Sequence, residues 1–310
     1  MDLTQALVET VHKARDFVVH VRTLEADGET TTLGSGVVFD HEHVLTSAQV
    51  VAGGEKSVTI RTAGGRKYEG SVVGVDPLYF VTVIRVDGWL PVEPPSIRTV
   101  DEVPLGLPVV AIGNAVGHDY NATLGVVSGV DRTVYRPERF PVDGLIITDA
   151  RIHPGNTGGA LVSLDGRLVG VNGIPWQHGL SLAVHADVVW RVVHQILDWG
   201  QATHAWLGFS GEPEVIDQAV VDLFALPFSQ GVTVFHVAPS GPGERAGIQV
   251  GDMVVRVKDQ PVTGLGSIRR VLSLHRLGER VPLTVLRDGE LQELEITVCE
   301  IPRLGERSGS

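Results

Sequence analysis

The amino-acid sequence predicts a mainly β protein, with two β-barrels followed by a smaller unit that mixes strands and helices. Glycine occurs 37 times among 310 residues, which favours short strands joined by tight turns. Runs with strand character recur from residue 34 to 86 and again from 109 to 172. Two successive β units of similar length are typical of two barrels packed together. The hydrophobic period then changes to that of a helix.

The first predicted barrel follows a short amphipathic piece at residues 6–15 and a strand-like run at 17–22. Residues 91–104 are rich in proline and read as a connector. The second barrel follows, and a helix over 186–199 with Gly200 at its C-terminal end closes the first domain. The expected strands share apolar residues, many of them β-branched, between turn signals, and they are residues 36–39, 44–46, 58–61, 68–75, 81–86, 109–113, 123–130, 145–149, 160–163 and 168–172.

Three parts of the chain are expected from these signals. Residues 1–200 form the double-barrel domain, residues 201–302 form a smaller domain, and residues 303–310 form a disordered tail. Strand patterns at 231–237 and 282–287 characterise the smaller domain. Asp288 and Gly289 mark a hairpin turn within it.

Charge and cysteine content exclude several classes of protein. The formal net charge is −12, so nucleic acids and anionic membranes are not expected as partners. The single cysteine, Cys299, permits no disulfide within the chain. No apolar run approaches the ~20 residues of a membrane span. The N-terminus lacks a signal-peptide pattern, which predicts a cytoplasmic protein, or a periplasmic or other extracytoplasmic one if an export segment has been removed.

Three segments carry a specific pattern. Residues 34–51 read GSGVVFDHEHVLTSAQVV, residues 73–86 read VGVDPLYFVTVIRV, and residues 148–162 read TDARIHPGNTGGALV. Their order and spacing resemble the trypsin-like serine proteases of the HtrA family. The resemblance extends from about residue 5 to residue 300 and implies a trypsin-like double β-barrel followed by a PDZ domain. It implies no cofactor and no metal site.

The resemblance also places the catalytic triad, and all three positions differ from the family pattern. Gln49 stands where the family has the histidine base, Phe80 where it has the orienting aspartate, and Thr157 where it has the serine nucleophile. An amide is not basic at neutral pH, and a phenyl ring cannot orient or stabilise a base. The sequence therefore predicts a pseudoprotease rather than an enzyme, with a residual oxyanion hole at Gly155 and Thr157.

The alternative to a pseudoprotease is a chain that still cleaves peptide bonds. Thr157 retains a hydroxyl, and His153 lies four residues before it in the same loop. On this alternative the chain is a serine-type endopeptidase of protein quality control, with a rearranged Thr157 site. His153 is otherwise a polar surface residue of the loop.

The second domain carries a peptide-binding signature. Residues 206–209 resemble the carboxylate-binding loop of PDZ domains, in which the backbone N–H groups of Leu207, Gly208 and Phe209 converge on a peptide C-terminus. A strand beginning at Phe209 and Ser210 is expected to pair with the peptide. Residues 237–252 match the family pattern that follows. A helix near residue 267 is expected to form the other wall, where Ile268 and Leu272 shape an apolar pocket and Val271 belongs to the core.

The predicted function is therefore that of an inactive HtrA-like homologue that binds peptides and acts as a chaperone-like or regulatory protein. Its expected partners are peptides or protein C-termini bound by the PDZ domain. The resemblance also implies a homo-trimer, or a hetero-oligomer with an active homologue. Phe17 is the one aromatic anchor in the N-terminal segment.

Overall fold

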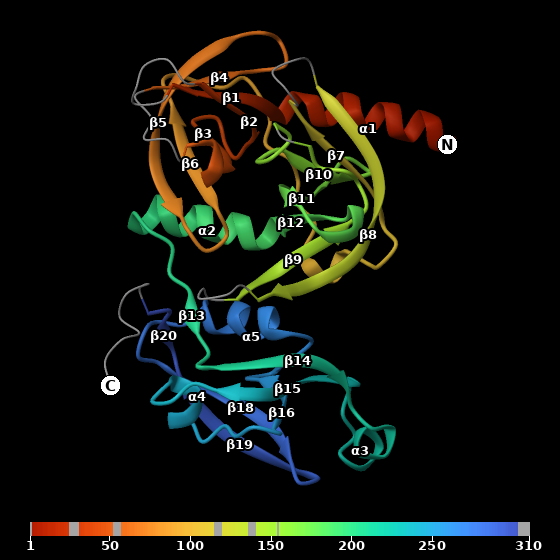
Figure 1. Cartoon of the computed structure of the whole chain (residues 1–310), viewed down its shortest axis with the longest axis vertical. Helices are drawn as coiled ribbons and strands as arrows, with labels where there is room; N and C mark the ends of the chain where they lie inside the picture. Colours follow the sequence, from red (N-terminus) through yellow and green to blue (C-terminus); the bar gives the residue numbers. More distant parts are fainter. Residues whose placement is uncertain are drawn as a thin grey trace. The chain divides into compact units, whose positions relative to one another are not determined.

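The first compact unit contains two closed β-barrels (Figure 1). The computed structural model describes residues 2–24, 31–51, 57–114, 120–135, 141–153 and 155–302, so the expected tail at 303–310 lies outside it. The first barrel has the strand order β1-β2-β3-β6-β5-β4. Its strands are β1 (Val18–Leu24), β2 (Thr31–Val38), β3 (His43–Ser47), β4 (Ser57–Arg61), β5 (Lys67–Asp76) and β6 (Val81–Val86).

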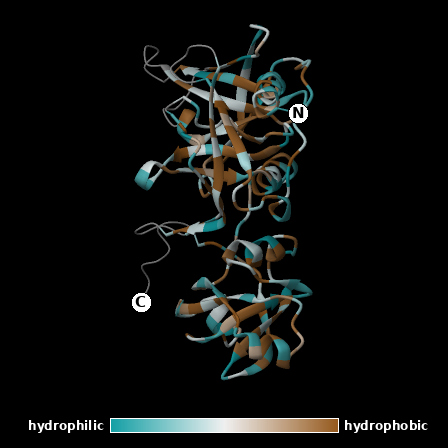
Figure 2. Ribbon diagram, turned by 90° about the vertical axis from the view of Figure 1, so that its right-hand side faces the viewer, coloured by the Kyte–Doolittle hydropathy of each residue, from teal (hydrophilic) through white to brown (hydrophobic). Residues whose placement is uncertain are grey.

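The second barrel closes in the order β10-β11-β12-β9-β8-β7. The strand pairs with a defined register in both barrels are antiparallel, and apolar residues fill the interiors. Figure 2 shows hydrophobic residues concentrated along these strands. The strands are β7 (Pro108–Gly113), β8 (Asn121–Val134), β9 (Val142–Thr148), β10 (Ala160–Ser163), β11 (Leu168–Pro175) and β12 (Ser181–His185). The prediction of a trypsin-like double barrel is confirmed.

Two helices accompany the barrels. Helix α1 (Leu3–Phe17) begins at Asp2, whose side chain caps the Thr4 N–H. It buries a stripe of residues at helical spacing, namely Ala6, Thr10, Ala14 and Phe17. This helix is longer than the amphipathic piece expected at 6–15, because Phe17 is its last residue rather than the start of a strand.

Helix α2 (Ala186–Trp199) has the bounds that its hydrophobic period predicts. It begins after His185, whose ring accepts a hydrogen bond from the Asp187 N–H. It ends at Gly200, which adopts the left-handed conformation with φ +78°. Its buried face is made of Val188, Val189, Val192, Val193 and Ile196, together with Ala186 and Gln195.

The second compact unit is a small α+β domain. Its main sheet has the order β14-β15-β16-β18-β19, with β17 paired to β16, and β13 pairs with β20. Helix α5 begins at Leu265, two residues earlier than the sequence suggests. The elements are β13 (Ala205–Trp206), β14 (Phe209–Val215), α3 (Gln218–Leu223), β15 (Gln230–Val237), α4 (Pro242–Arg245), β16 (Met253–Val257), β17 (Gln260–Pro261), α5 (Leu265–Leu272), β18 (Arg280–Arg287), β19 (Glu290–Thr297) and β20 (Cys299–Glu300).

Clustering of the chain into compact units gives 1–130 with 144–202, and 131–143 with 203–310. The segment 131–143 therefore groups with the second unit, although it belongs to the double-barrel domain in the sequence. The boundaries at 200 and 302 stay a prediction. Among the described residues, no helix is long and apolar enough to cross a membrane.

Candidate functional site

The turn that carries Thr157 is built from glycines and anchored to the other barrel. Gly155 and Gly158 have φ values of +93° and +83°, a region that side chains rarely adopt. The Ser35 N–H donates to the Thr157 carbonyl at 3.1 Å, and the Ser35 hydroxyl donates to the Gly155 carbonyl at 2.6 Å. Strand β2 of the first barrel thus fixes the turn of the second.

Gly158 is required by close packing as well as by its backbone conformation. A Cβ atom at this position would lie 2.3 Å from the Ser35 carbonyl oxygen, 2.7 Å from Thr46 Oγ1 and 2.8 Å from the Ser47 nitrogen. The turn therefore lies directly against strands β2 and β3. Its contact on β3, Ser47, is two residues before Gln49 in the sequence.

The other two triad positions meet at the end of β3. Gln49 lies in the short 3-10 helix η1 (Ala48–Val50), and the Ser47 side chain accepts a hydrogen bond from its N–H. The Ala48 N–H donates to the Phe80 carbonyl at 2.7 Å. Phe80 adopts φ +56°, which is uncommon outside glycine, and is half-buried. The residue before Gln49 is thus hydrogen-bonded to Phe80, and the Thr157 turn lies against β2 and β3, while the role of the three positions as one site stays a prediction.

The Thr157 hydroxyl donates a hydrogen bond to the Gly173 carbonyl at 2.9 Å. Within the described part of the chain it has no imidazole or amine as a hydrogen-bond partner. His153 is half-buried, and its backbone carbonyl accepts from the Asn156 N–H at 2.9 Å. Its ring makes no hydrogen bond to Thr157. Among the described residues, therefore, no imidazole or amine is in hydrogen-bond contact with this hydroxyl to remove its proton.

Gly155 and Thr157 carry the N–H groups that the resemblance assigns to an oxyanion hole, and this role stays a prediction. Among the described residues, the N–H groups of Gly155 and Thr157 donate no hydrogen bond. Both residues are partly accessible, whereas Asn156 between them is fully buried. Two N–H groups that have no acceptor among the described residues of this turn can bind the negative oxygen that forms when a carbonyl carbon is attacked.

Sequence reasoning missed Ser35. Both its N–H and its hydroxyl hold the Thr157 turn, and the hydroxyl also accepts from the Asn114 N–H at 2.7 Å. Its signal in the sequence is weak, since it is a small residue between Gly34 and Gly36, where neighbouring backbone approaches closely.

The second candidate site is the loop before β14. Gly208 has φ +68°, and a Cβ atom there would lie 2.6 Å from Pro242 Cδ and 2.9 Å from the Gly243 nitrogen. The Gly208 carbonyl accepts from the Ala238 N–H at 2.7 Å. In the described structure the N–H groups of Leu207 and Gly208 donate no hydrogen bond. They are available to an acceptor from outside the chain, as a carboxylate-binding loop requires.

The apolar residues assigned to this site lie mainly in the core of the domain. Leu207 and Phe209 are buried, Ser210 is half-buried, and Val271 packs against the core as expected. Ile268 and Leu272 on α5 are 2% and 0% exposed. Their role in binding a peptide stays a prediction, because the same side chains hold the domain together.

The two units match known protein families. Residues 34–171 match the trypsin-like peptidase domain, and residues 207–298 match the PDZ domain. Together with the barrels and the Thr157 turn, this defines a trypsin-like peptidase domain joined to a peptide-binding module. The chain therefore combines a trypsin-like peptidase domain with a PDZ domain, and it is similar to HtrA-type serine proteases.

Individual relatives agree with this assignment. A probable periplasmic serine endoprotease DegP-like from Halomonas elongata is 32% identical over 281 residues, which cover 88% of this chain and 58% of the relative. A protein of the same name from Ectopseudomonas mendocina is 30% identical, covering 90% of this chain and 58% of the relative. The chain thus spans less than two thirds of the length of these relatives.

Solved structures are similar over nearly the whole chain. The HtrA-type protease AlgW with a tripeptide has a TM-score of 0.71 and 26% identity, covering 95% of this chain and 97% of the other. The serine endoprotease from Yersinia pestis has a TM-score of 0.63 and 27% identity, covering 95% and 98%.

These comparisons contradict the prediction that the chain is a pseudoprotease and not an enzyme. The similar proteins are named serine endoproteases, and nothing among the described residues demonstrates loss of activity. The prediction went too far because it rested on the residue types at positions 49, 80 and 157. In related sites the oxyanion hole and substrate binding alone retain a residual ~10³–10⁴-fold acceleration over water.

The cytoplasmic location predicted from the N-terminus is also contradicted. The relatives that match most of the chain are named periplasmic. An N-terminal sequence without a signal-peptide pattern does not report where a mature protein resides, because export segments are removed.

Proposed function

We propose that this chain is a periplasmic protein that binds the C-termini of polypeptides through its PDZ domain and cleaves polypeptides slowly, with Thr157 as nucleophile. The observation that carries the proposal is the pair of open donor sets. One set is the N–H groups of Leu207 and Gly208, and the other is those of Gly155 and Thr157. Each is suited to an oxygen of a peptide, as a carboxylate in the first case and an oxyanion in the second.

In the proposed cleavage, Thr157 Oγ1 attacks the carbonyl carbon of the scissile peptide. The carbonyl oxygen becomes negative and accepts hydrogen bonds from the N–H groups of Gly155 and Thr157. The carbon–nitrogen bond then breaks, and the nitrogen leaves as an amine carrying the proton of the hydroxyl. Because the Gln49 amide is not basic, this proton passes through water. A second water hydrolyses the resulting ester and restores the hydroxyl.

The rate is expected to be low. Loss of the nucleophile or base in a comparable triad costs about 10⁶ in turnover, while the oxyanion hole and binding energy remain. The threonine methyl group also restricts the rotation of the hydroxyl. Long incubations are therefore needed to detect the activity.

Cleavage is tested by incubating the full chain with casein, an unfolded protein, and measuring released fragments by mass spectrometry. Thr157→Ala is expected to abolish fragment release because it removes the attacking oxygen. Thr123→Ala removes a hydroxyl elsewhere in the same barrel and is expected to leave release unchanged. Fragments that persist in Thr157→Ala, or a wild-type chain that releases none, contradict the cleavage part of the proposal.

Peptide binding is tested separately by titrating a peptide with an apolar C-terminal residue and a free carboxylate. Gly208→Ala is expected to weaken binding by more than about tenfold, since a Cβ atom disturbs the loop and its donors. The same peptide with an amidated C-terminus is expected not to bind. Equal binding of the acid and amide forms contradicts the peptide-binding part of the proposal.

The predicted homo-trimer or hetero-oligomer stays a prediction, which mass measurement in solution tests.

A further inference from the structure

A groove of about 470 Å³ lies on the outer face of the first barrel, away from the Thr157 turn. Its floor is made by β1, β4 and β5, whose registers place His20 opposite Arg61, and Arg61 opposite Lys67. The next row places Arg22 opposite Thr59, and Thr59 opposite Glu69. The lining residues are His20, Arg22, Leu24, Thr59, Arg61, Lys67 and Glu69.

Among the described residues that line this groove, basic side chains outnumber carboxylates. Arg61 and Lys67 contribute two permanent cations against the single carboxylate of Glu69, in a chain whose formal net charge is −12, while Arg22 has a further interaction of its own. Arg61 and Lys67 face each other on neighbouring strands, and neither has an ion pair or hydrogen bond from its side chain within the described structure. Like charges directly opposite each other destabilise a sheet unless an anion lies between them.

The positive charges of the groove also affect the pKa of His20. Burial, followed by the positive charges of Arg61 and Arg22, lowers the pKa of His20 below its usual value. The lowered pKa favours the neutral form of the ring. Its Nε2 atom is buried and has no hydrogen-bond partner among the described protein atoms. An imidazole nitrogen without a partner, beside two guanidinium groups, is suited to a strong hydrogen-bond acceptor.

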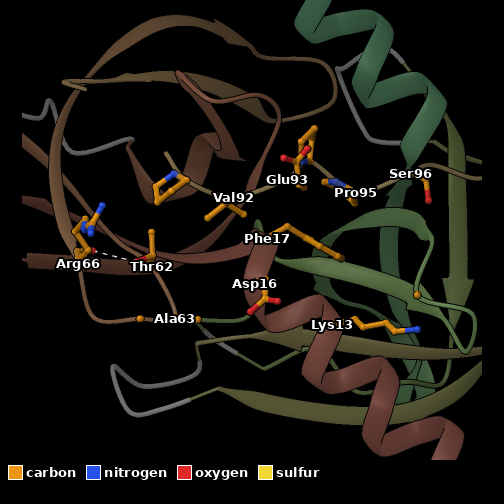
Figure 3. Close-up of a pocket in the computed structure, with 14 residues that line it drawn as sticks. Lys13, Asp16, Phe17, Thr62, Ala63, Arg66, Val92, Glu93, Pro95 and Ser96 are labelled. Carbon is orange, nitrogen blue, oxygen red and sulfur yellow. Dashed lines mark hydrogen bonds between the residues drawn. The ribbon is translucent and has the colours of Figure 1, made fainter. Parts of the chain in front are cut away.

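The neighbouring pocket, of about 690 Å³, differs in charge (Figure 3). It lies at the C-terminal end of α1 and the turn between β4 and β5. Lys13 and Arg66 are balanced there by Asp16 and Glu93. The excess of positive charge is thus a property of the groove over β1, β4 and β5 and not of the adjoining pocket.

We infer that this groove binds the phosphate group of a small molecule, held by Arg61 and Lys67 with His20 as an additional hydrogen-bonding group. Arginine presents a planar fork that matches two phosphate oxygens, and lysine adds a compact point charge. The volume suits a small molecule. The inference uses none of the residues of the two proposed peptide sites, so it stands or fails independently of them.

Binding is tested by titrating inorganic phosphate into the full chain by calorimetry. Arg61→Gln is expected to weaken binding by about tenfold or more, because it removes a charged hydrogen-bond donor. Arg85→Gln is the matched control, since Arg85 lies on β6 outside the groove, is exposed and contacts Glu42 at 3.4 Å. It is expected to leave the affinity within about twofold. No binding to the wild-type chain, or an equal loss in both variants, overturns the inference.

A second measurement does not depend on variants. The imidazole signals of His20 in the NMR spectrum of the wild-type chain are expected to shift on addition of phosphate, and the pKa of His20 to rise towards its usual value. Unchanged His20 signals at saturating phosphate overturn the inference.

Sedimentation with phosphatidylglycerol vesicles distinguishes the source of the phosphate. Co-sedimentation that Arg61→Gln abolishes supports a lipid source, and phosphate binding without co-sedimentation supports a soluble one.

Discussion

Replacing Gly158 with alanine is expected to destabilise the trypsin-like domain by about 2–5 kcal/mol. The estimate combines about 1–2 kcal/mol for a side chain in the left-handed region with about 1–3 kcal/mol for overpacking. The steric part is at the upper end because the Cβ atom would meet the Ser35 carbonyl at 2.3 Å, and backbone cannot swing aside as a long side chain can.

The measurement is chemical unfolding of the full chain, followed by circular dichroism. Gly106→Ala is the matched control, because Gly106 has nearly the same φ, +82°, with no atom within 4 Å of the added Cβ. It is expected to lose only the conformational part, about 1 kcal/mol. Equal losses in the two variants contradict the argument from close packing.

The second large effect is expected in the PDZ domain. Arg287 Nε donates to Asp252 Oδ1 at 2.6 Å, and its Nη2 donates to Oδ2 at 2.7 Å. Asp252 is 1% exposed, and this pairing raises the pKa of Arg287 above its usual value. Asp252→Asn removes the negative charge that is paired directly with this guanidinium, and leaves it with neutral acceptors at Gly247 and Gln292. The expected loss is about 3 kcal/mol, the lower end for a broken buried pair because the Arg287 side chain is 19% exposed.

This loss is measured as a shift of the unfolding transition of the PDZ domain by calorimetry. Glu295→Gln is the control, since it breaks the exposed pair between Arg280 and Glu295, which are 3.6 Å apart. Exposed pairs contribute about 0–1 kcal/mol, so little change is expected. The transition of the trypsin-like domain is expected to stay in place in both variants. A loss in Glu295→Gln as large as in Asp252→Asn contradicts the role of burial.

The regular elements of the fold could be predicted from the sequence because their signals are local. Helix α2 follows from the spacing of its valines and from Gly200 at its end. The grouping of 131–143 with the second unit could not be predicted, because it depends on contacts between distant residues. One such contact is the hydrogen bond from the Tyr135 hydroxyl to the Gly211 carbonyl at 2.8 Å.

The roles of the candidate site residues stay predictions. Motif spacing located Gln49, Phe80 and Thr157, and the structure shows backbone hydrogen bonds from Ala48 to Phe80 and from Ser35 to Thr157. The positive φ of Phe80 and the hydrogen bond from Thr157 to Gly173 cannot be predicted from the sequence, because both depend on the tertiary structure within each barrel. The groove with Arg61 and Lys67 escaped notice for a similar reason. Its cations are scattered along the chain and become neighbours only through strand register.

The closure of both barrels limits where an extended peptide can pair with the backbone. A closed barrel has no unpaired outer strand, so neither barrel of the first unit offers an edge for strand addition. Strand β14 in the second unit is an outermost strand of an open sheet. Under the proposed function, strand pairing with a bound peptide is therefore expected at β14 and not at the outer strands of the barrels.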